Sequence, residues 1–245
     1  MEDRIFEIGG AGLDSTDQRV RKLMDNVVNS QVPGYQNSEV VITGFPLELD
    51  KAAAKLSSIK PQAEGTFYSH IQGGLVKTGG KLDLALASDG YFVIAGPWGE
   101  GYTRDGRFRL DKDGRVLTVA GNFPVLGQGG PLVVSPGADV EFSQAGEMKI
   151  DGTLVDRIRV VKPEQQETLD SLNGSIFKKR SNSSVVSDVD DPRVIQGYVE
   201  TSNVNVVDEM MEMIYLSRIY GLDSKVISTR TSNLEKAISM SQPAQ

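Results

Sequence analysis

The chain of 245 residues contains no cysteine and a single histidine, His70. Without cysteine, it can form no disulfide scaffold, no thiolate zinc site and no cysteine nucleophile. One histidine is too few for most catalytic zinc sites, and it leaves only one candidate histidine base. His70 stands in the aromatic and apolar run Phe67–Ile71, and we interpret it as a structural residue. The sequence therefore predicts a protein that is not an enzyme, with no catalytic residues, no cofactor and no metal site.

Long apolar runs are also missing, since none approaches the ~20 residues that a membrane-spanning helix needs. The opening residues Met1 to Arg4 include the acidic Glu2 and Asp3, and no apolar core with a small-residue cleavage site follows them, so we expect no Sec-type signal peptide. Basic residues number 26 against 33 acidic ones, a formal net charge of −7. An acidic protein does not suit a nucleic-acid backbone. We therefore expect no nucleic-acid partner and no direct membrane insertion.

The first 31 residues have the pattern of a helix. Ser15 and Gln18 have capping-box spacing, and the run Gly9–Gly12 is expected to interrupt or loosen the apolar segment before them. Proline in Val32–Tyr35 should end the helix, because it cannot continue the hydrogen-bond ladder. One helical face is predicted to carry Val20, Leu23, Met24, Val27 and Val28.

Residues 40–200 have the pattern of β structure, and residues 62–78 that of an extended connector with a strand or two. Short apolar or alternating runs alternate with turn dipeptides. This pattern predicts an α+β protein: a central antiparallel all-β domain with a helix at each end. We divide the chain into 1–36 and 201–245 as helical assembly segments, 37–80 as connector and 81–200 as β domain. The expected strands are 82–86, 91–94, 107–110, 132–134 and 158–161, and the expected hairpin turns are Asp89-Gly90, Asp105-Gly106, Asp113-Gly114 and Asp151-Gly152.

The C-terminal zone predicts a second helix, capped by Asn205 and running to about Met240. Between Met210 and Tyr220, eight of eleven residues are apolar or aromatic, which is too many for a helix with one solvated face. The two end helices could simply pair as a hairpin under the β domain. The apolar excess favours coiled-coil-like packing with helices of other subunits instead. The assembly residues predicted in this zone are Val204, Val207, Met210, Met211, Ile214, Ile219, Tyr220, Leu222, Val226 and Ile227.

Several short motifs carry no specific chemistry. Asp111–Gly114 resembles the start of a calcium loop but lacks its later ligands, so we interpret it as a hairpin turn. The glycine-rich runs Gly96–Gly101 and Gly127–Pro131 lack phosphate-loop spacing and are interpreted as turns. Lys178–Arg180 is interpreted as a solvated basic loop, and Asp188–Asp191 as an exposed acidic turn.

Three segments, in the right order, resemble the bacterial flagellar rod and hook proteins. They are the helix end and turn Asn26–Gln36, the central stretches Asp89–Phe92 and Tyr102–Gly106, and the stretch Gly197–Met210. Asp25 and Gly9–Gly12 depart from the family pattern. The residues that match the family motifs are Asn26, Asn29, Pro33, Gly34, Tyr35, Ser202, Asn203 and Val204.

The resemblance implies a structural subunit of the flagellar basal-body rod, exported through the flagellar type III machinery. Family members pack terminal helices from many subunits around an axial channel, with the β domain outside. The implied partners are other copies of the chain, neighbouring rod proteins and the surrounding rings. Residues 82–86 and 124–132 favour the proximal rod form, and residues 36–62 look short for the distal form, which comes second.

Two functions of other classes stay open at this stage. A secreted β-rich binding module with an oligomerising helical stalk would need a ligand site in the β zone, for which Trp98 and Tyr102 are the nearest candidates. A hydrolase with paired carboxylates is compatible with the composition, but no motif supports it.

Overall fold

A computed structural model describes residues 2–43, 62–135, 137–164, 169–180 and 185–241. The chain divides into two compact units. We call residues 1–27, 38–67 and 205–245 the helical unit, and residues 28–37 and 68–204 the β unit. The α+β class with a mostly β centre and a helix at each end is confirmed.

The first helix, α1 (Glu2–Asn29), is continuous through Gly9–Gly12, so the predicted interruption is wrong. A helical glycine costs only about 1 kcal/mol relative to alanine, which the rest of a long helix offsets. The predicted capping box is wrong as well. Ser15 lies within the helix, where its Oγ donates to the carbonyl of Gly12 at 2.9 Å instead of capping a terminus.

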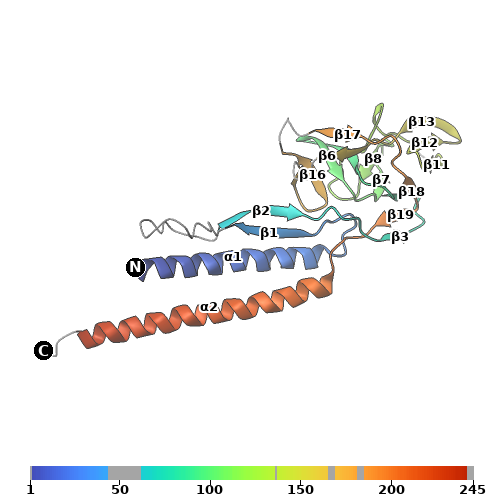
Figure 1. The fold of residues 1–245 in the computed structure, drawn as a ribbon. Helices are drawn as coiled ribbons and strands as arrows, with labels where there is room; N and C mark the ends of the chain where they lie inside the picture. Colours follow the sequence, from blue (N-terminus) through green and yellow to red (C-terminus); the bar gives the residue numbers. More distant parts are fainter. Residues whose placement is uncertain (1, 44–61, 136, 165–168, 181–184, 242–245) are drawn as a thin grey trace. The chain divides into compact units, whose positions relative to one another are not determined.

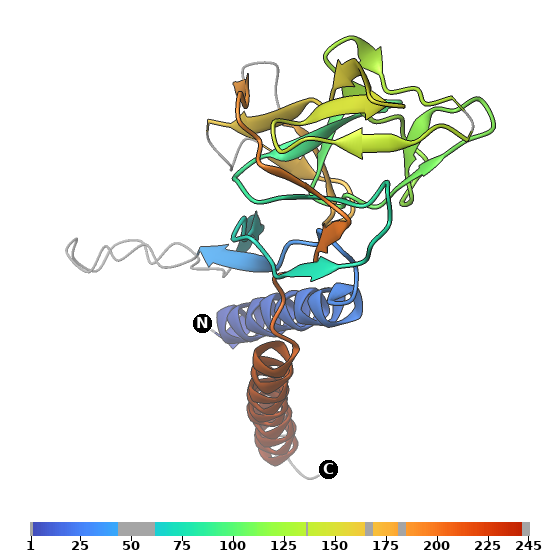
Figure 2. The same cartoon turned by 90° about the vertical axis from the view of Figure 1, so that its right-hand side faces the viewer.

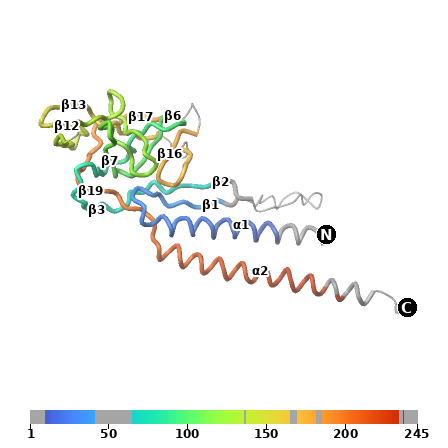
Figure 3. The backbone as a smooth tube through the Cα atoms, turned by 180° about the vertical axis from the view of Figure 1, so that it is seen from behind, coloured from blue at the N-terminus to red at the C-terminus, as the bar shows by residue number. Residues whose placement is uncertain are grey.

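The second helix, α2 (Val206–Ser241), begins and ends close to the predicted positions. Asn205 caps it, since its Oδ1 accepts from the backbone N–H of Val207 at 3.1 Å and its Nδ2 donates to Asp208 at 2.6 Å. Val204 lies before the helix, which corrects its assignment as a helical residue. Within the helical unit, α1 lies between α2 and the ribbon of β1 (Ser38–Thr43) and β2 (Gln62–Tyr68) (Figures 1 and 2). The two helices run in opposite directions (Figure 3).

The expected connector strands are confirmed as β2 and β3 (Leu75–Lys77). The interpretation of residues 36–62 as short for a distal form falls mostly outside the described residues, because 44–61 are not described.

The β unit is built on a six-stranded sheet in the order β15-β16-β6-β5-β14-β17. Its neighbouring strands are antiparallel, as predicted. The strands of this sheet are β5 (Tyr91–Gly96), β6 (Gly99–Thr103), β14 (Val160–Pro163), β15 (Leu169–Ser171), β16 (Ile176–Lys179) and β17 (Val186–Asp188).

Smaller antiparallel sheets accompany it: β11-β12-β13 and the pairs β3-β19, β4-β18, β7-β8 and β9-β10. Their remaining strands are β4 (Leu84–Leu86), β7 (Phe108–Leu110), β8 (Val116–Thr118), β9 (Leu126–Gly127), β10 (Gly130–Pro131), β11 (Val140–Phe142), β12 (Glu147–Ile150), β13 (Thr153–Arg157), β18 (Val194–Gln196) and β19 (Tyr198–Glu200).

Strand β5 is buried on both faces of the sheet. Phe92 and Ile94 belong to the larger apolar cluster of the β unit, whereas Tyr91 and Val93 belong to a second cluster. Because successive side chains of a strand point to opposite faces, these four residues must serve two separate cores. That is why Tyr91–Ile94 is continuously apolar rather than alternating.

Two of the predicted hairpin turns are confirmed. Asp151 and Gly152 join β12 to β13 with positive φ angles of 49° and 79°. Asp113 and Gly114 lie in the loop between β7 and β8, where the Asp111 carboxylate accepts from the Asp113 and Arg115 N–H groups. The glycine-rich runs are also turns, at the β5–β6 and β9–β10 hairpins.

Asp89-Gly90 and Asp105-Gly106 do not form hairpins, because the strands on either side of each dipeptide pair with other strands. Beside Asp89-Gly90, β4 pairs with the distant β18 and β5 with β14 and β6. Beside Asp105-Gly106, β6 pairs with β5 and the distant β16, and β7 pairs with β8, so neither dipeptide joins two strands that pair with each other. Residues 132–134 form no strand, only a bridge between Arg115 and Val133.

The basic cluster is not a loop, since Lys178 and Lys179 belong to β16 and Arg180 pairs with Asp170 at 2.7 Å. At the acidic run, Asp188 belongs to β17 and pairs with Arg159 at 2.8 Å.

Candidate assembly site

Helix α2 presents a broad exposed apolar surface. Ile214 is 54% exposed, Leu222 65% and Val226 67%. At about 100° per residue, the exposed apolar side chains span roughly 160° of the helix circumference. They are Val207, Met210, Met211, Ile214, Tyr215, Leu222 and Val226, and Tyr220 is exposed outside this arc. Ile219 and Ile227 are partly exposed.

The opposite side of α2 is buried within the helical unit. Glu209 and Leu216, seven residues apart on one helical face, are 7% and 3% exposed. Over its first turns, α2 is therefore covered on one side and carries mainly apolar side chains on the other, where an ordinary surface helix is polar. The exposed charged side chains of Arg218 and Lys225 lie among these apolar ones.

Helix α1 uses its predicted apolar face only in part. Leu23 is buried, Val20 and Val27 are half-buried, and Met24 and Val28 are exposed. Of the face predicted from spacing, only Leu23 is buried within the single chain. Two of its apolar side chains, Met24 and Val28, are exposed and open to other contacts.

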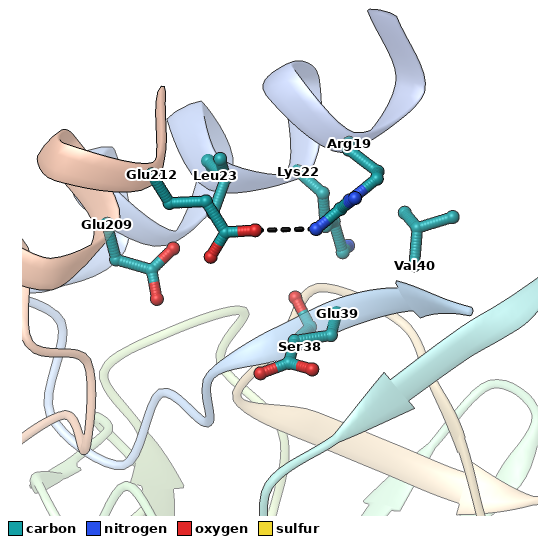
Figure 4. A pocket seen from close by; sticks show the side chains of 8 residues that line it. All are labelled: Arg19, Lys22, Leu23, Ser38, Glu39, Val40, Glu209 and Glu212. Atoms are coloured by element: carbon teal, nitrogen blue, oxygen red, sulfur yellow. Dashed lines mark hydrogen bonds and ion pairs between the residues drawn. The ribbon is translucent and has the colours of Figure 1, made fainter. Parts of the chain in front are cut away.

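Between the C-terminal half of α1, the N-terminal turns of α2 and β1, the helical unit has a small polar cavity of about 90 Å³ (Figure 4). The side chains around it come from α1, β1 and α2. Across it, Arg19 of α1 forms an ion pair with Glu212 of α2 at 2.6 Å. Both partners are substantially exposed, so the pair contributes little to stability.

The family-motif residue Asn26 lies fully buried in the last turns of α1. Its side-chain amide pairs with the backbone of Ser38: Nδ2 donates to the Ser38 carbonyl at 2.9 Å, and Oδ1 accepts from the Ser38 N–H at 3.2 Å. Nδ2 also donates to the Glu209 carboxylate of α2 at 3.0 Å. One amide thus joins α1, β1 and α2.

The turn after α1 is fitted into the β unit. Gly34 has φ +67°, and a Cβ there would lie 2.3 Å from the backbone nitrogen of Asp105. Tyr35 is 4% exposed, with its ring against Gly174. Pro33, half-buried, precedes them, and the carbonyl of Asn29 accepts from the Val32 N–H at 2.9 Å. The motif Pro-Gly-Tyr therefore needs glycine for close backbone approach and tyrosine to fill a core site.

A buried ion pair lies beside this turn. Arg104 Nη1 and Glu200 Oε2 are 3.0 Å apart, and their side chains are 3% and 4% exposed. The other Glu200 oxygen accepts from the Gly73 N–H at 3.0 Å, and the Glu200 backbone carbonyl accepts from the Gly34 N–H at 2.9 Å. The Arg104 guanidinium also lies 5.3 Å from the centre of the Tyr91 ring. A single pair thus holds three segments that are distant in sequence.

A further motif asparagine, Asn203, joins three segments of the β unit. Its Oδ1 accepts from the Asn37 N–H at 2.6 Å, while its Nδ2 donates to the carbonyls of Ser69 and Ile71, each at 2.8 Å. Its neighbour Ser202 makes a local bond, accepting from the Val204 N–H at 3.2 Å.

His70 lies in the second apolar cluster, against Tyr91 and Phe177. The Tyr91 hydroxyl accepts from Gln36 Nε2 and bonds Nδ1 of His70. Burial, and then the Arg104 charge, lower the pKa of His70 to about 4, so the ring is neutral at pH 7. Burial raises the pKa of Tyr91 to about 12. These contacts support the interpretation of His70 as a structural residue.

Several residues of this site were missed by the sequence analysis. Ser38 carries no signal, and Gln36 and Glu209 lie inside resemblance motifs that indicate no partner for them. Arg104 and Glu200 stood inside resemblance motifs, but their pairing across 96 positions has no local signature. Among the described residues, no cluster of His, Asp and Glu could hold a metal ion. None of the described helices combines the length and the apolar character needed to cross a bilayer.

Comparison with known proteins decides the family. A family model described as flagellar basal body rod FlgEFG protein C-terminal matches residues 195–240, and one described as flagellar hook protein FlgE/F/G D1 domain matches residues 85–150. The flagellar basal-body rod protein FlgF of Rhizobium meliloti is 30% identical over 224 residues, which are 91% of each chain. The chain belongs to the flagellar basal-body rod family. It is a structural rod subunit of the bacterial flagellar basal body.

Other relatives of this rod protein carry two names. FlgG of Buchnera aphidicola subsp. Acyrthosiphon pisum is 27% identical over 253 residues, covering 94% of this chain and 96% of the relative. FlgF of Salmonella typhimurium is 28% identical over 253 residues, covering 97% of each. The matched C-terminal region contains every exposed apolar side chain of α2 named above, so this surface lies in a part of the rod protein that a family model matches.

Proposed function

We propose that the chain is the proximal rod subunit, of the FlgF type. Its terminal helices pack in a coiled-coil-like layer with those of neighbouring copies and other rod proteins. The layer forms part of the shaft that carries torque from motor to hook. The observation that supports packing through the terminal helices most directly is the apolar arc of α2, which the single chain leaves exposed.

The width of that arc favours contact with more than one helix. A two-helix seam needs a stripe narrower than the ~100° typical of a surface helix, whereas the exposed arc spans roughly 160°. Contacts on two sides are what a layer of helices around an axis requires. Because such contacts join unlike surfaces of successive copies, they extend as a helical array instead of closing into a dimer.

The choice of the proximal form has support of two kinds. Residues 82–86 and 124–132 resemble the proximal form, and the FlgF protein of Rhizobium meliloti is 30% identical, against 27% for FlgG of Buchnera aphidicola. Imaging a tagged chain in purified basal bodies tests the choice directly, because it locates the label along the rod.

Assembly through α2 is tested by Ile214→Asp. Ile214 is 54% exposed in the single chain, so we expect the substitution to leave the melting temperature of the isolated protein nearly unchanged. In a dry helix–helix seam, an unpaired carboxylate costs several kcal/mol per subunit, and every copy repeats the defect. We expect loss of rods in electron micrographs and loss of swimming.

His70→Ala is the contrasting variant, because His70 belongs to the β unit and the helices belong to the helical unit. It should leave swimming nearly intact. A motile Ile214→Asp strain would contradict assembly through this face. A non-motile His70→Ala strain whose protein is folded and exported would indicate a site-based function instead.

A further inference from the structure

The covalent connections between the two units lie close in sequence to the motif asparagines Asn26 and Asn203. The chain passes from one unit to the other four times, after residues 27, 37, 67 and 204. Any force that one unit exerts on the other through the backbone is carried by these four passages. How each unit holds the ends of the passages therefore decides whether they bear force together or singly.

Within the β unit, Asn203 holds three of these ends. It lies one residue before the last residue of the unit, and its Oδ1 accepts from Asn37, where an earlier passage leaves. Its Nδ2 donates to Ser69 and Ile71, where the chain has just returned. The Ser69 N–H in turn donates to the Asn37 carbonyl at 2.7 Å. The three ends form one hydrogen-bonded group.

Within the helical unit, Asn26 does the same for the complementary ends. Asn26 lies one residue before the end of segment 1–27, and Ser38 is the first residue of segment 38–67. Glu209 lies in the first turn of α2, near the start of segment 205–245. Asn26 bonds the Ser38 backbone through both amide atoms and bonds the Glu209 carboxylate as well. Each unit thus uses one buried or half-buried asparagine to tie three ends together.

We propose that Asn26 and Asn203 are positioning residues for torque transmission: each fastens three passage ends within its own unit, so that load is shared among passages. The inference rests on the proposed function of the chain as a rod subunit. It predicts that losing one amide uncouples the ends locally, without unfolding the sheet and without preventing assembly.

The test uses the full chain with Asn203→Ala, and Asn173→Ala as matched control. Asn173 also bonds backbone groups in the β unit, those of Ser175 and Ile176, but within a single loop. In wild type, hydrogen exchange at the Asn37 and Ser69 amides should be slow. In Asn203→Ala it should rise at least tenfold at both, while β5 and β6 keep their protection. Asn173→Ala should leave both amides unchanged.

A second variant separates the two halves of the Asn203 contact. Asn203→Asp keeps an acceptor for the Asn37 N–H but removes both donors and sets a carboxylate against the Ser69 and Ile71 carbonyls. We expect the Asn37 amide to stay protected, and exchange at Ser69 to rise at least tenfold. Unchanged exchange at Ser69 in this variant would overturn the proposed grouping.

The functional readout is swimming speed as the viscosity of the medium is raised. Asn203→Ala strains should build basal bodies in normal number, yet lose at least twofold more speed under load than Asn173→Ala strains. The proposal would be overturned if the Asn203→Ala and Asn173→Ala strains swam at equal speeds under load. It would also be overturned if hydrogen exchange in β5 and β6 of Asn203→Ala rose as much as at Asn37 and Ser69. Absence of rods in both Asn203 variants would assign the amide to assembly instead, and would equally overturn it. Basal bodies that never contain even the wild-type chain would refute the proposed function itself.

Discussion

Replacing Arg104 by methionine tests whether the buried ion pair stabilises the β unit. The substitution keeps most of the side-chain volume but leaves the Glu200 carboxylate, 4% exposed, with the Gly73 N–H as its remaining bond described above. Breaking a buried pair by removing one partner costs about 3–5 kcal/mol, since an uncompensated charge stays in the interior. With a urea m-value of about 2 kcal/mol/M, a loss of 3 kcal/mol moves the unfolding midpoint down by about 1.5 M.

The sole tryptophan provides the assay. Trp98 packs edge-on against Phe123 at 4.9 Å in the β unit, so its fluorescence reports unfolding of that unit. The matched control is Lys162→Met, which removes an exposed partner of Asp89 in the same unit and should leave the midpoint nearly unchanged.

A double variant completes the argument. Arg104→Met with Glu200→Gln removes both charges, while the glutamine oxygen can still accept from Gly73. Most of the lost stability should return, because neutral replacements of a buried pair are often tolerated. If Arg104→Met unfolds at the same urea concentration as Lys162→Met, the pair does not stabilise the unit and the reasoning from burial is wrong.

Two further substitutions in the β unit have clear expected outcomes. Gly34→Ala should lower the melting temperature far more than Gly79→Ala: both glycines have positive φ, +67° and +75°, but only at Gly34 would the new Cβ meet backbone, while Gly79 has open space. Equal losses would mean that φ strain alone matters. His70→Gln should change the pH dependence of unfolding. The folded-state pKa of about 4 lies below the ordinary 6.5, so wild type loses stability from this group as pH falls from 6.5 through 4, and the variant should lack that one-proton slope.

The elements that sequence predicted well are those decided locally. Asn205 caps α2 through bonds to residues two and three positions away, so its helix start could be read from the chain. The Asp151-Gly152 turn is local in the same sense. The predicted interruption at Gly9–Gly12 was wrong because the low helix propensity of glycine is a small effect, which the rest of a long helix outweighs.

The order of distant strands and the partners of buried polar groups could not be predicted from the sequence. Strand β6 pairs with β16, which lies more than seventy residues later, and no turn signal marks that pairing. The motif resemblance singled out Asn26 and Asn203, yet it named neither Ser38 nor Ser69 as their partners. Such contacts depend on how separate segments pack, which single-sequence periodicity does not record.

The use of asparagine at positions 26 and 203 has a physical reason. A carboxamide presents one donor group and one acceptor in a plane, the same pair that a peptide group offers, so it can pair with backbone where no strand is available. Asn26 does this with both backbone atoms of Ser38. A charged side chain could make comparable bonds only at a larger desolvation cost, and it would need a counter-charge, as Arg104 has in Glu200. A neutral amide therefore fastens chain ends at buried positions without a counter-charge, and it leaves the apolar arc of α2 as the surface on which copies meet.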